Sequence, residues 1–186
     1  DHEEIMQAGR RFGANVCMTD PAHATGTDRV AEVAANLDAR IILNIQGDEP
    51  FIDYRNLDKA IMPLLKDKDI IVSTLASKID DIREINDPNT VKVVFDKEKF
   101  AVDFFRTVKP YNIKKGKANF YKHIGLYVYR KNYLLKFIKL KPSKRELAEK
   151  LEQLRILDNN GDIKVVLTRL NSQSVDTKDD LKKIKK

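Results

Sequence analysis

The stretch RIILNIQGDEP, residues 40–50, decides the fold class of this 186-residue chain. Its segment 41–45 is a short apolar run rich in β-branched residues, and Gly47 and Pro50 follow it, which is the pattern of a buried strand. Asp48 comes where that strand ends. In open α/β sheets ligands bind outside the carboxyl ends of the strands, and a carboxylate there can hold Mg²⁺ together with substrate phosphates. The alternative is an acidic turn residue that only faces water.

Helices and strands alternate along the chain on both sides of this stretch. Apolar spacing predicts helices over 2–12, 29–36, 55–67, 145–157 and 177–184, and strands over 14–18, 41–45, 70–75 and 163–168. In the helix over 145–157, Leu147, Leu151 and Leu154 are expected to point inward. Such alternation is typical of βαβ units. The sequence therefore predicts one α/β domain over residues 1–186, with a mixed, mainly parallel sheet.

The middle of the chain, residues 91–130, has a different pattern. Two apolar runs over 91–95 and 100–105 flank the polar tetrapeptide DKEK and predict an antiparallel hairpin. Residues 123–130 alternate, with Ile124, Leu126 and Val128 on one face of a strand. A basic loop is expected over 109–119. We therefore predict an antiparallel insertion whose apolar face either joins a second copy of the chain or covers the helices of its own domain.

The composition limits the classes of function. Apolar residues make up 42% of the chain and charged residues 34%, which suits a globular protein, and no apolar run approaches the ~18 residues that span a bilayer. The net charge is +7, but the lysines are scattered, so we expect no nucleic-acid partner and no membrane insertion. Cys17 is the only cysteine; we expect it to be buried in a strand and the protein to be cytoplasmic.

Six short motifs occur in a characteristic order. They are TGTDR (25–29), QGDEP (46–50), NTVKVV (89–94), HIGLY (123–127), LEQLR (151–155) and VDT (175–177). In this order and spacing the chain resembles the 3-deoxy-manno-octulosonate (Kdo) cytidylyltransferases, or CMP-Kdo synthetases. The resemblance runs from Asp1 to about Lys182.

The resemblance implies a Rossmann-like nucleotidyltransferase fold and an Mg²⁺-dependent reaction. Enzymes of this family transfer CMP from CTP to Kdo and release pyrophosphate, for lipopolysaccharide synthesis in Gram-negative bacteria. Their metal-binding aspartates match Asp48 and Asp176, which would carry the catalysis. The family is typically homodimeric through the antiparallel region. For Asp176, the residues alone also allow a helix cap before Thr177.

The nucleotide would bind near the start of the predicted helix over 29–36. Backbone N–H groups at a helix N-terminus bind anions. By resemblance, the residues that contact the nucleotide are Thr25, Gly26, Thr27, Arg29 and Gln46. The amide of Gln46 offers a donor and an acceptor to a pyrimidine edge. An ordinary N-cap at Thr25 or Thr27 and a surface pair at Arg29 are the structural alternatives.

The sugar acid would need a cation for its carboxylate and acceptors for its hydroxyls. By resemblance, its pocket is formed by Arg106, His123, Tyr127, Glu152 and Gln153. The guanidinium of Arg106 matches a carboxylate. On a continuous helix, Glu152 and Gln153 would point about 100° apart, which argues against both reaching one ligand. A structural histidine and a solvated Glu152 are the alternatives.

The sequence departs from the family pattern at two places. The chain carries DFFR at 103–106 where the family usually has Tyr-Phe-Ser-Arg, so Phe105 replaces a small hydroxyl residue. The family also opens with a strand and a phosphate-binding loop that this sequence lacks, and we expect the chain to be N-terminally incomplete. Two alternatives follow, namely a nucleotidyltransferase for a related acid such as an amino-Kdo, or an inactive fragment that retains only dimerisation.

Overall fold

The computed structural model describes residues 2–108, 120–170, 174–175 and 181–182. The helices in this part of the chain are α1 (Glu3–Arg11), α2 (Gly26–Ala35), α3 (Tyr54–Lys66), α4 (Ile82–Asn86), α5 (Lys131–Phe137), α6 (Lys144–Glu149) and α7 (Leu154–Asp158). The strands are β1 (Ile41–Ile45), β2 (Val72–Lys78), β3 (Lys92–Phe95), β4 (Ala101–Phe105), β5 (Tyr121–Arg130) and β6 (Ile163–Thr168). The predicted loop over 109–119 and most of the predicted helix over 177–184 lie outside the described residues.

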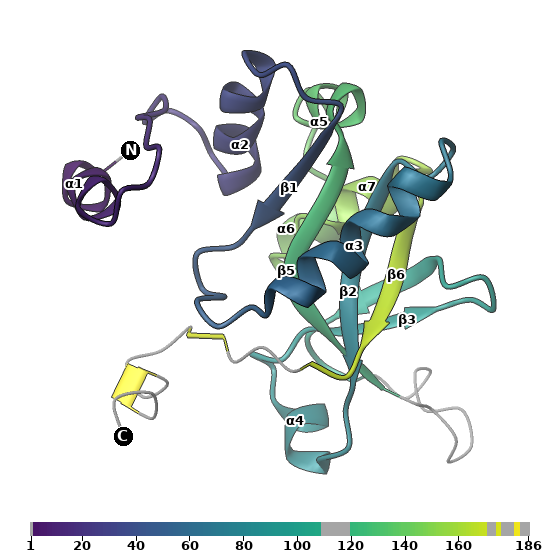
Figure 1. Cartoon of the computed structure of the whole chain (residues 1–186). Helices are drawn as coiled ribbons and strands as arrows, with labels where there is room; N and C mark the ends of the chain where they lie inside the picture. Colours follow the sequence, from purple (N-terminus) through teal and green to yellow (C-terminus); the bar gives the residue numbers. More distant parts are fainter. Residues whose placement is uncertain (1, 109–119, 171–173, 176–180, 183–186) are drawn as a thin grey trace.

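One mixed sheet carries the fold, with the strand order β4-β3-β5-β2-β6 and β1 paired to β5 (Figure 1). β2 and β6 are parallel neighbours, and the other described pairs are antiparallel. These pairings make β1, β2, β3 and β6 run in one direction and β4 and β5 in the other. The α/β class and the mixed sheet are confirmed. The segment 121–130 is not peripheral, however, because β5 lies between β1 and β2 at the centre of the sheet.

Helices cover both faces of the sheet, which gives three layers (Figure 1). On one face, α3 packs against apolar side chains of β2 and β5. On the other face, α2, α5 and α7 pack against a larger cluster that includes Tyr127 and Tyr129 of β5. The two faces of β5 therefore have different roles, as the alternating pattern over 123–130 predicts.

The apolar face of β5 is buried inside the chain. Ile124, Leu126 and Val128 are at most 1% exposed and pack against Ala60 and Leu64 of α3. Of the two partners that the sequence allows for this face, the domain's own helix is confirmed. The alternative, a contact of these three side chains with a second copy of the chain, does not fit their burial under α3. Dimerisation through another part of the antiparallel region stays a prediction.

The segment 14–18 was predicted to be a strand and is not one. Among the described residues no strand pairs with it, and strand formation depends on a paired neighbour more than on local preference. Val16 instead packs on α1, where a Cβ built at Gly9 would lie 2.7 Å from Val16 Cγ2. Cys17 is exposed, so the expected buried thiol is wrong as well.

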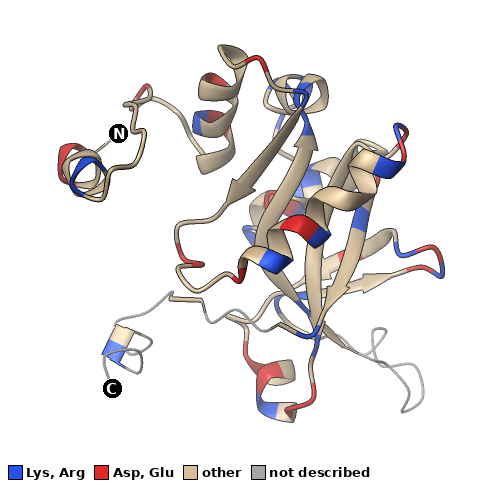
Figure 2. Cartoon of the chain, viewed as in Figure 1, with Lys and Arg blue, Asp and Glu red and all other residues tan. Residues whose placement is uncertain are grey.

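The N-terminal helix contributes nothing to the core. α1 has no buried residue and lies apart from the sheet (Figure 1). Figure 2 shows Lys and Arg interspersed with Asp and Glu over most elements, in line with the scattered charges of the sequence. No helix in the described ranges is long and apolar enough to cross a membrane.

Candidate functional site

A pocket of about 910 Å³ opens beside β5, next to the loop that follows β1. Its walls come from six parts of the chain, namely the β1–α3 loop, the 84–91 segment, Arg106, β5, the 150–153 turn and Ser174. Seven of the predicted site residues line it, and they are Gln46, Asp48, Arg106, His123, Tyr127, Glu152 and Gln153. The fold therefore gathers into one cavity residues that are up to 107 positions apart in the sequence.

The QGDEP loop is fastened to β5 at Gly125. The Gln46 N–H donates to the Gly125 carbonyl at 3.0 Å, and the Gly125 N–H donates to Glu49 Oε1 at 3.1 Å. A Cβ built at Gly125 would lie 3.3 Å from Gln46 Cγ, so a side chain here would press on the loop. The absence of a side chain at Gly125 lets the loop lie close to the strand and lets Gln46 and Asp48 line the pocket.

Asp48 also lies next to a late segment of the chain. The Val175 N–H donates to the Asp48 carbonyl at 2.8 Å, and Ser174 lines the same pocket. Val175 directly precedes Asp176, the second predicted metal ligand, which itself lies outside the described residues. Within the described ranges, no group of three or more His, Cys, Asp or Glu side chains could hold a metal ion. The main chain is therefore bonded to Asp48, the first predicted ligand, at the residue just before Asp176, the second.

The N-terminus of α2 contacts the pocket through Glu152. Thr25 caps the helix, because its hydroxyl accepts the Asp28 N–H while Asp28 accepts the Thr25 N–H. The two threonine hydroxyls then donate to the two carboxylate oxygens of Glu152, Thr25 at 2.9 Å and Thr27 at 2.6 Å. The N-cap alternative for Thr25 is therefore confirmed, and α2 is tied to a predicted sugar-acid residue.

Two other residues predicted to bind nucleotide have different surroundings. A Cβ built at Gly26 would lie 3.9 Å from Gln46 Oε1, so Gly26 is next to the pocket loop. Arg29 donates to the Thr19 hydroxyl and to the carbonyls of Asp20 and His23, and it does not line the pocket. These contacts hold the 19–23 loop onto α2. The nucleotide-binding role of Arg29 stays a prediction.

The predicted helix over 145–157 is broken. α6 ends at Glu149, its C-cap Lys150 has a left-handed φ of 54°, and α7 begins at Leu154. Leu151 and Leu154 are buried as expected, but Leu147 is 67% exposed, contrary to the prediction. Because the chain turns between the two helices, Glu152 and Gln153 both line the pocket. The objection that neighbouring helical residues diverge by 100° therefore does not apply, and the solvated-face alternative for Glu152 is wrong.

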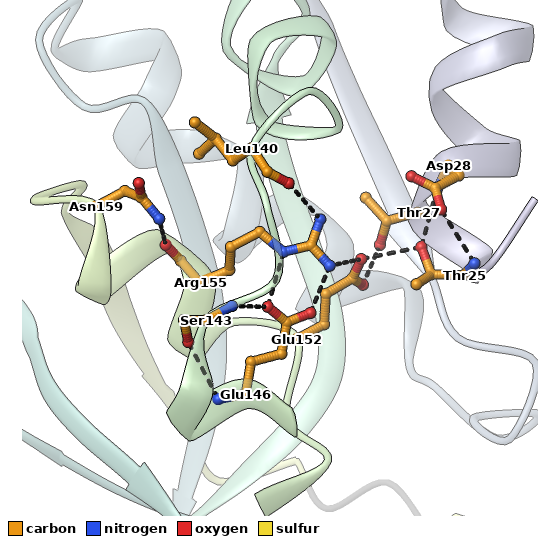
Figure 3. A network of polar contacts seen from close by, with 9 residues as sticks. All are labelled: Thr25, Thr27, Asp28, Leu140, Ser143, Glu146, Glu152, Arg155 and Asn159. Atoms are coloured by element: carbon orange, nitrogen blue, oxygen red, sulfur yellow. Dashed lines mark hydrogen bonds and ion pairs between the residues drawn. The ribbon is translucent and has the colours of Figure 1, made fainter. Parts of the chain in front are cut away.

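A buried ion pair spans this break, and sequence reasoning did not single it out (Figure 3). Arg155 Nε donates to Glu146 Oε2 at 2.8 Å, and a second bond joins Arg155 Nη2 to Glu146 Oε1. Arg155 Nη2 also lies 3.8 Å from Glu152 Oε1. The sequence signal was present in the LEQLR motif, where an arginine follows Glu152 by three residues.

The pKa values around this pair follow from burial and from the donors. Burial raises the pKa of the Glu152 carboxyl, while the hydroxyls of Thr27 and Thr25 and the charge of Arg155 act in the opposite direction. The hydrogen bond to Glu146 raises the pKa of Arg155, so its guanidinium is charged. Glu152 is thus a desolvated acceptor that two hydroxyls and one cation hold in place.

His123 is held in one tautomer by Thr74. The Thr74 hydroxyl donates its single proton to the Leu126 carbonyl at 2.7 Å, so at 3.0 Å it accepts from His123 Nε2–H. Desolvation lowers the pKa of His123 to about 3, and the ring is therefore neutral near pH 7 with Nδ1 as an acceptor. A neutral imidazole suits the hydroxyls of a polyol better than it suits a carboxylate.

The ring of Tyr127 is tilted by 39° against that of His123 at a centroid distance of 5.2 Å, and its buried hydroxyl has no hydrogen-bond partner among the described residues. Burial raises the pKa of this phenol well above its usual value, so the hydroxyl keeps its proton. A buried hydroxyl normally has a partner. A polar ligand in the pocket would supply one.

Arg106 lines the pocket and is held by main-chain oxygens. Its Nε donates to the Glu149 carbonyl at 3.1 Å and its Nη1 to the Pro88 carbonyl at 3.3 Å. The preceding Phe105 packs with Ile79 and Phe120 in a separate cluster and does not line this pocket. The residue at which the sequence departs from the family pattern therefore lies outside the pocket lining.

A sequence model of the cytidylyltransferase family matches residues 1–174. Among curated proteins, the chain is 48% identical to the 3-deoxy-manno-octulosonate cytidylyltransferase of Geobacter metallireducens, and the match covers 99% of this chain and 77% of that protein. The enzyme of the same name from Geotalea daltonii is 47% identical, with the same coverage. The chain thus spans about three quarters of the length of these relatives.

Among solved structures, the fold matches CMP:2-keto-3-deoxy-manno-octonic acid synthetase complexed with CTP, with a TM-score of 0.90 and 36% identity over 99% of this chain and 76% of that one. The 4-diphosphocytidyl-2C-methyl-D-erythritol synthase of Anaerococcus prevotii matches with a TM-score of 0.56 at 18% identity, over 96% of this chain and 73% of that one. The second likeness extends to the fold alone.

Proposed function

Because this chain belongs to the cytidylyltransferase family, we propose that it transfers CMP from CTP to the sugar acid Kdo, for lipopolysaccharide synthesis. The observation that carries the proposal is the gathering of Gln46, Asp48, Arg106, His123, Tyr127, Glu152 and Gln153 around one pocket in a fold that matches a CTP complex. In the reaction, a hydroxyl oxygen of the sugar acid forms a bond to the α-phosphorus of CTP. The bond from that phosphorus to the pyrophosphate breaks, and pyrophosphate leaves.

The residues divide into two groups by the chemistry they offer. Near the loop after β1, Gln46 offers an amide to the cytosine. In the same pocket, neutral His123, the Tyr127 hydroxyl, Glu152 and Gln153 offer acceptors and donors to the hydroxyls of a polyol, and Arg106 offers a cation to its carboxylate. Transfer of this kind needs positioning and charge neutralisation more than covalent help from the protein.

We infer that Asp48 and Asp176 hold Mg²⁺. Carboxylate oxygens are the ligands that this ion takes from proteins, together with substrate phosphates. The bond from Val175 to Asp48 supports the pairing, because it fixes the residue before Asp176 against the first ligand. When bound, the ion neutralises the phosphate oxygens and the leaving pyrophosphate.

Two further parts of the proposal concern assembly and location. A homodimer is proposed by analogy with the family, but through a surface other than the face of Ile124, Leu126 and Val128, which α3 covers. A cytoplasmic location agrees with the single exposed thiol, Cys17, since free thiols persist in reducing compartments.

The function is tested by pyrophosphate release from this chain with CTP, Kdo and Mg²⁺, omitting each in turn. Release that requires all three supports the proposal, and release that persists with UTP or without the sugar acid refutes it. An amino-substituted Kdo is the comparison substrate. Because Phe105 lies outside the pocket, we expect Kdo to be preferred.

The metal assignment is tested with Asp48→Asn, which keeps the volume and removes the charge. We expect turnover to fall by at least about a hundredfold, because the site loses a carboxylate ligand. Asp58→Asn on the exposed side of α3 is the matched control and should leave turnover unchanged. Normal turnover by Asp48→Asn at low Mg²⁺ concentration would show that the ion is held elsewhere.

A further inference from the structure

We propose that Arg155 and Glu146 form a clamp that holds the 150–153 turn in the conformation that presents both Glu152 and Gln153 to the sugar acid. Arg155 is then a positioning residue, because it is 4% exposed and does not line the pocket. The inference rests on the proposed function for the identity of the ligand. It goes beyond that function because it proposes that two residues outside the pocket, Arg155 and Glu146, determine the shape of part of the pocket wall.

The break between α6 and α7 lies at a left-handed residue. Two helices meet here without a glycine, and Lys150 adopts a left-handed conformation that costs a residue with a side chain about 1 kcal/mol or more. A strained turn persists only where its surroundings fix it. The Leu151 N–H donates to the Glu146 carbonyl at 3.2 Å, which closes α6, and the Leu154 N–H donates to the Leu151 carbonyl at 3.1 Å, which leads into α7. These main-chain bonds are local to the turn, whereas a side-chain pair joins the two helices directly.

The side chains of Glu146 and Arg155 form a bridge across this break. Glu146 lies in the first turn of α6, where its side chain also accepts the Ser143 N–H at 3.0 Å. Arg155 lies at the second position of α7 and bonds both oxygens of Glu146 (Figure 3). A planar guanidinium that meets a carboxylate in two places fixes orientation as well as distance. The pair therefore fixes α6 to α7 on the buried side of the break, while Arg145 and Asp158 join the same helices on the outer side.

Arg155 also affects the charge of Glu152. Arg155 Nη2 lies 3.8 Å from Glu152 Oε1, so one buried guanidinium faces two carboxylates. Burial acts to neutralise Glu152, and the nearby positive charge acts to keep it ionised. Arg155 therefore influences both the position of Glu152 and its charge.

Glu152 is also connected to α2. Each oxygen of Glu152 accepts one threonine hydroxyl from the N-terminus of that helix, as Figure 3 shows. Glu152 thus has supports on two sides, the guanidinium on one and the hydroxyls of Thr25 and Thr27 on the other. Loss of either support should move the same carboxylate, which gives the inference two independent tests.

The kinetic test compares Arg155→Lys with the unaltered chain. Lysine keeps the charge but cannot bond both Glu146 oxygens and the Leu140 carbonyl at once. We expect the KM for the sugar acid to rise about tenfold or more, with the KM for CTP within about twofold, because displacement of a binding group weakens the ligand it touches. Thr27→Val, which removes one hydroxyl at constant shape, should shift the same KM in the same direction.

Arg145→Lys is the matched control. Arg145 also joins two carboxylates, Asp103 and Asp158, but on the outer side of the same helices and away from the pocket. It should leave both KM values unchanged. If Arg155→Lys keeps the original KM for the sugar acid, or if Arg145→Lys raises it equally, the clamp is refuted.

A second measurement needs no turnover and follows amide hydrogen exchange in a peptide that covers 147–157. In Arg155→Lys and in Glu146→Gln we expect exchange in this peptide to speed up about tenfold, with a peptide from β3 and β4 unchanged. Equal protection in the variants and the unaltered chain would overturn the clamp. If the unaltered chain releases no pyrophosphate, the proposed function fails while the exchange result still decides the clamp.

Discussion

Replacement of Lys92 by methionine should destabilise this protein and loosen one wall of its pocket. Lys92 is 0% exposed, although lysine is almost never fully buried without partners. Its ammonium donates to the carbonyls of Asp87 at 2.6 Å and Thr90 at 2.8 Å and to the carbonyl of Arg106. One cation thus joins the 87–90 loop to Arg106, and both line the pocket.

The magnitude follows from these three bonds. A hydrogen bond to a charged group contributes about 1.5–3 kcal/mol, so three contribute about 4–9 kcal/mol before the cost of dehydrating the ammonium. That cost is real, because burial lowers the pKa of Lys92 despite the opposing charge of Asp87. Methionine keeps the packing of the stem but leaves three carbonyls without this donor. We expect a net loss of about 3 kcal/mol in the free energy of unfolding.

Urea unfolding followed by circular dichroism measures this loss. With an m-value near ~2 kcal/mol/M, the midpoint should fall by about 1.5 M. Lys164→Met is the control, because Lys164 donates to the Glu98 carbonyl at an exposed site, and its midpoint should move by less than about 0.3 M. A Lys92→Met midpoint equal to that of the control would refute the reasoning. The KM for the sugar acid should also rise, through the displaced Arg106.

Two further predictions concern β5. The pKa of His123 is lowered to about 3 by desolvation, so between about pH 3 and 6.5 the unfolded chain binds a proton there that the folded chain does not, and stability falls as the pH falls. From pH 6.5 to 5 the free energy of unfolding should fall by about 1–2 kcal/mol. Guanidinium unfolding at the two pH values measures this fall, and His123→Gln should make it smaller. An equal fall in the variant would contradict a neutral His123 in the folded chain. Tyr127→Phe removes a buried hydroxyl without a partner among the described residues, so the melting temperature should stay equal or rise while the KM for the sugar acid increases about two- to tenfold, and an unchanged KM would exclude the hydroxyl as a ligand contact.

Local sequence patterns predicted helices and strands correctly where neighbouring residues in the sequence are enough to determine the type of element. The apolar run over 41–45 is β1, the spacing over 55–67 is α3, and the alternation over 123–130 separates the two faces of β5. The apolar segment 14–18 shows the limit, because an apolar run forms a strand only when another strand pairs with it. Local preference could not reveal whether such a partner exists.

The site shows the same division. Resemblance placed Gln46, Asp48 and Glu152 at the pocket because motifs in register carry that information. Helical periodicity, however, predicted a continuous helix over 145–157 and thereby an obstacle to Glu152 and Gln153 binding one ligand. The structure removes the obstacle through the turn at Lys150, which tertiary contacts of Arg155 and Glu146 stabilise against local preference.

The sequence by itself therefore determined the α/β class, the elements with strong apolar periodicity and the family of the pocket residues. Only the tertiary structure decided that β5 lies at the centre of the sheet, that α3 covers its apolar face, and that Arg155 and Lys92 support the pocket from outside it. The physical reason is that periodicity reports which side of an element is buried but not what buries it. A buried charge is stabilised by partners far away in the sequence, and those partners are known only once the chain has folded.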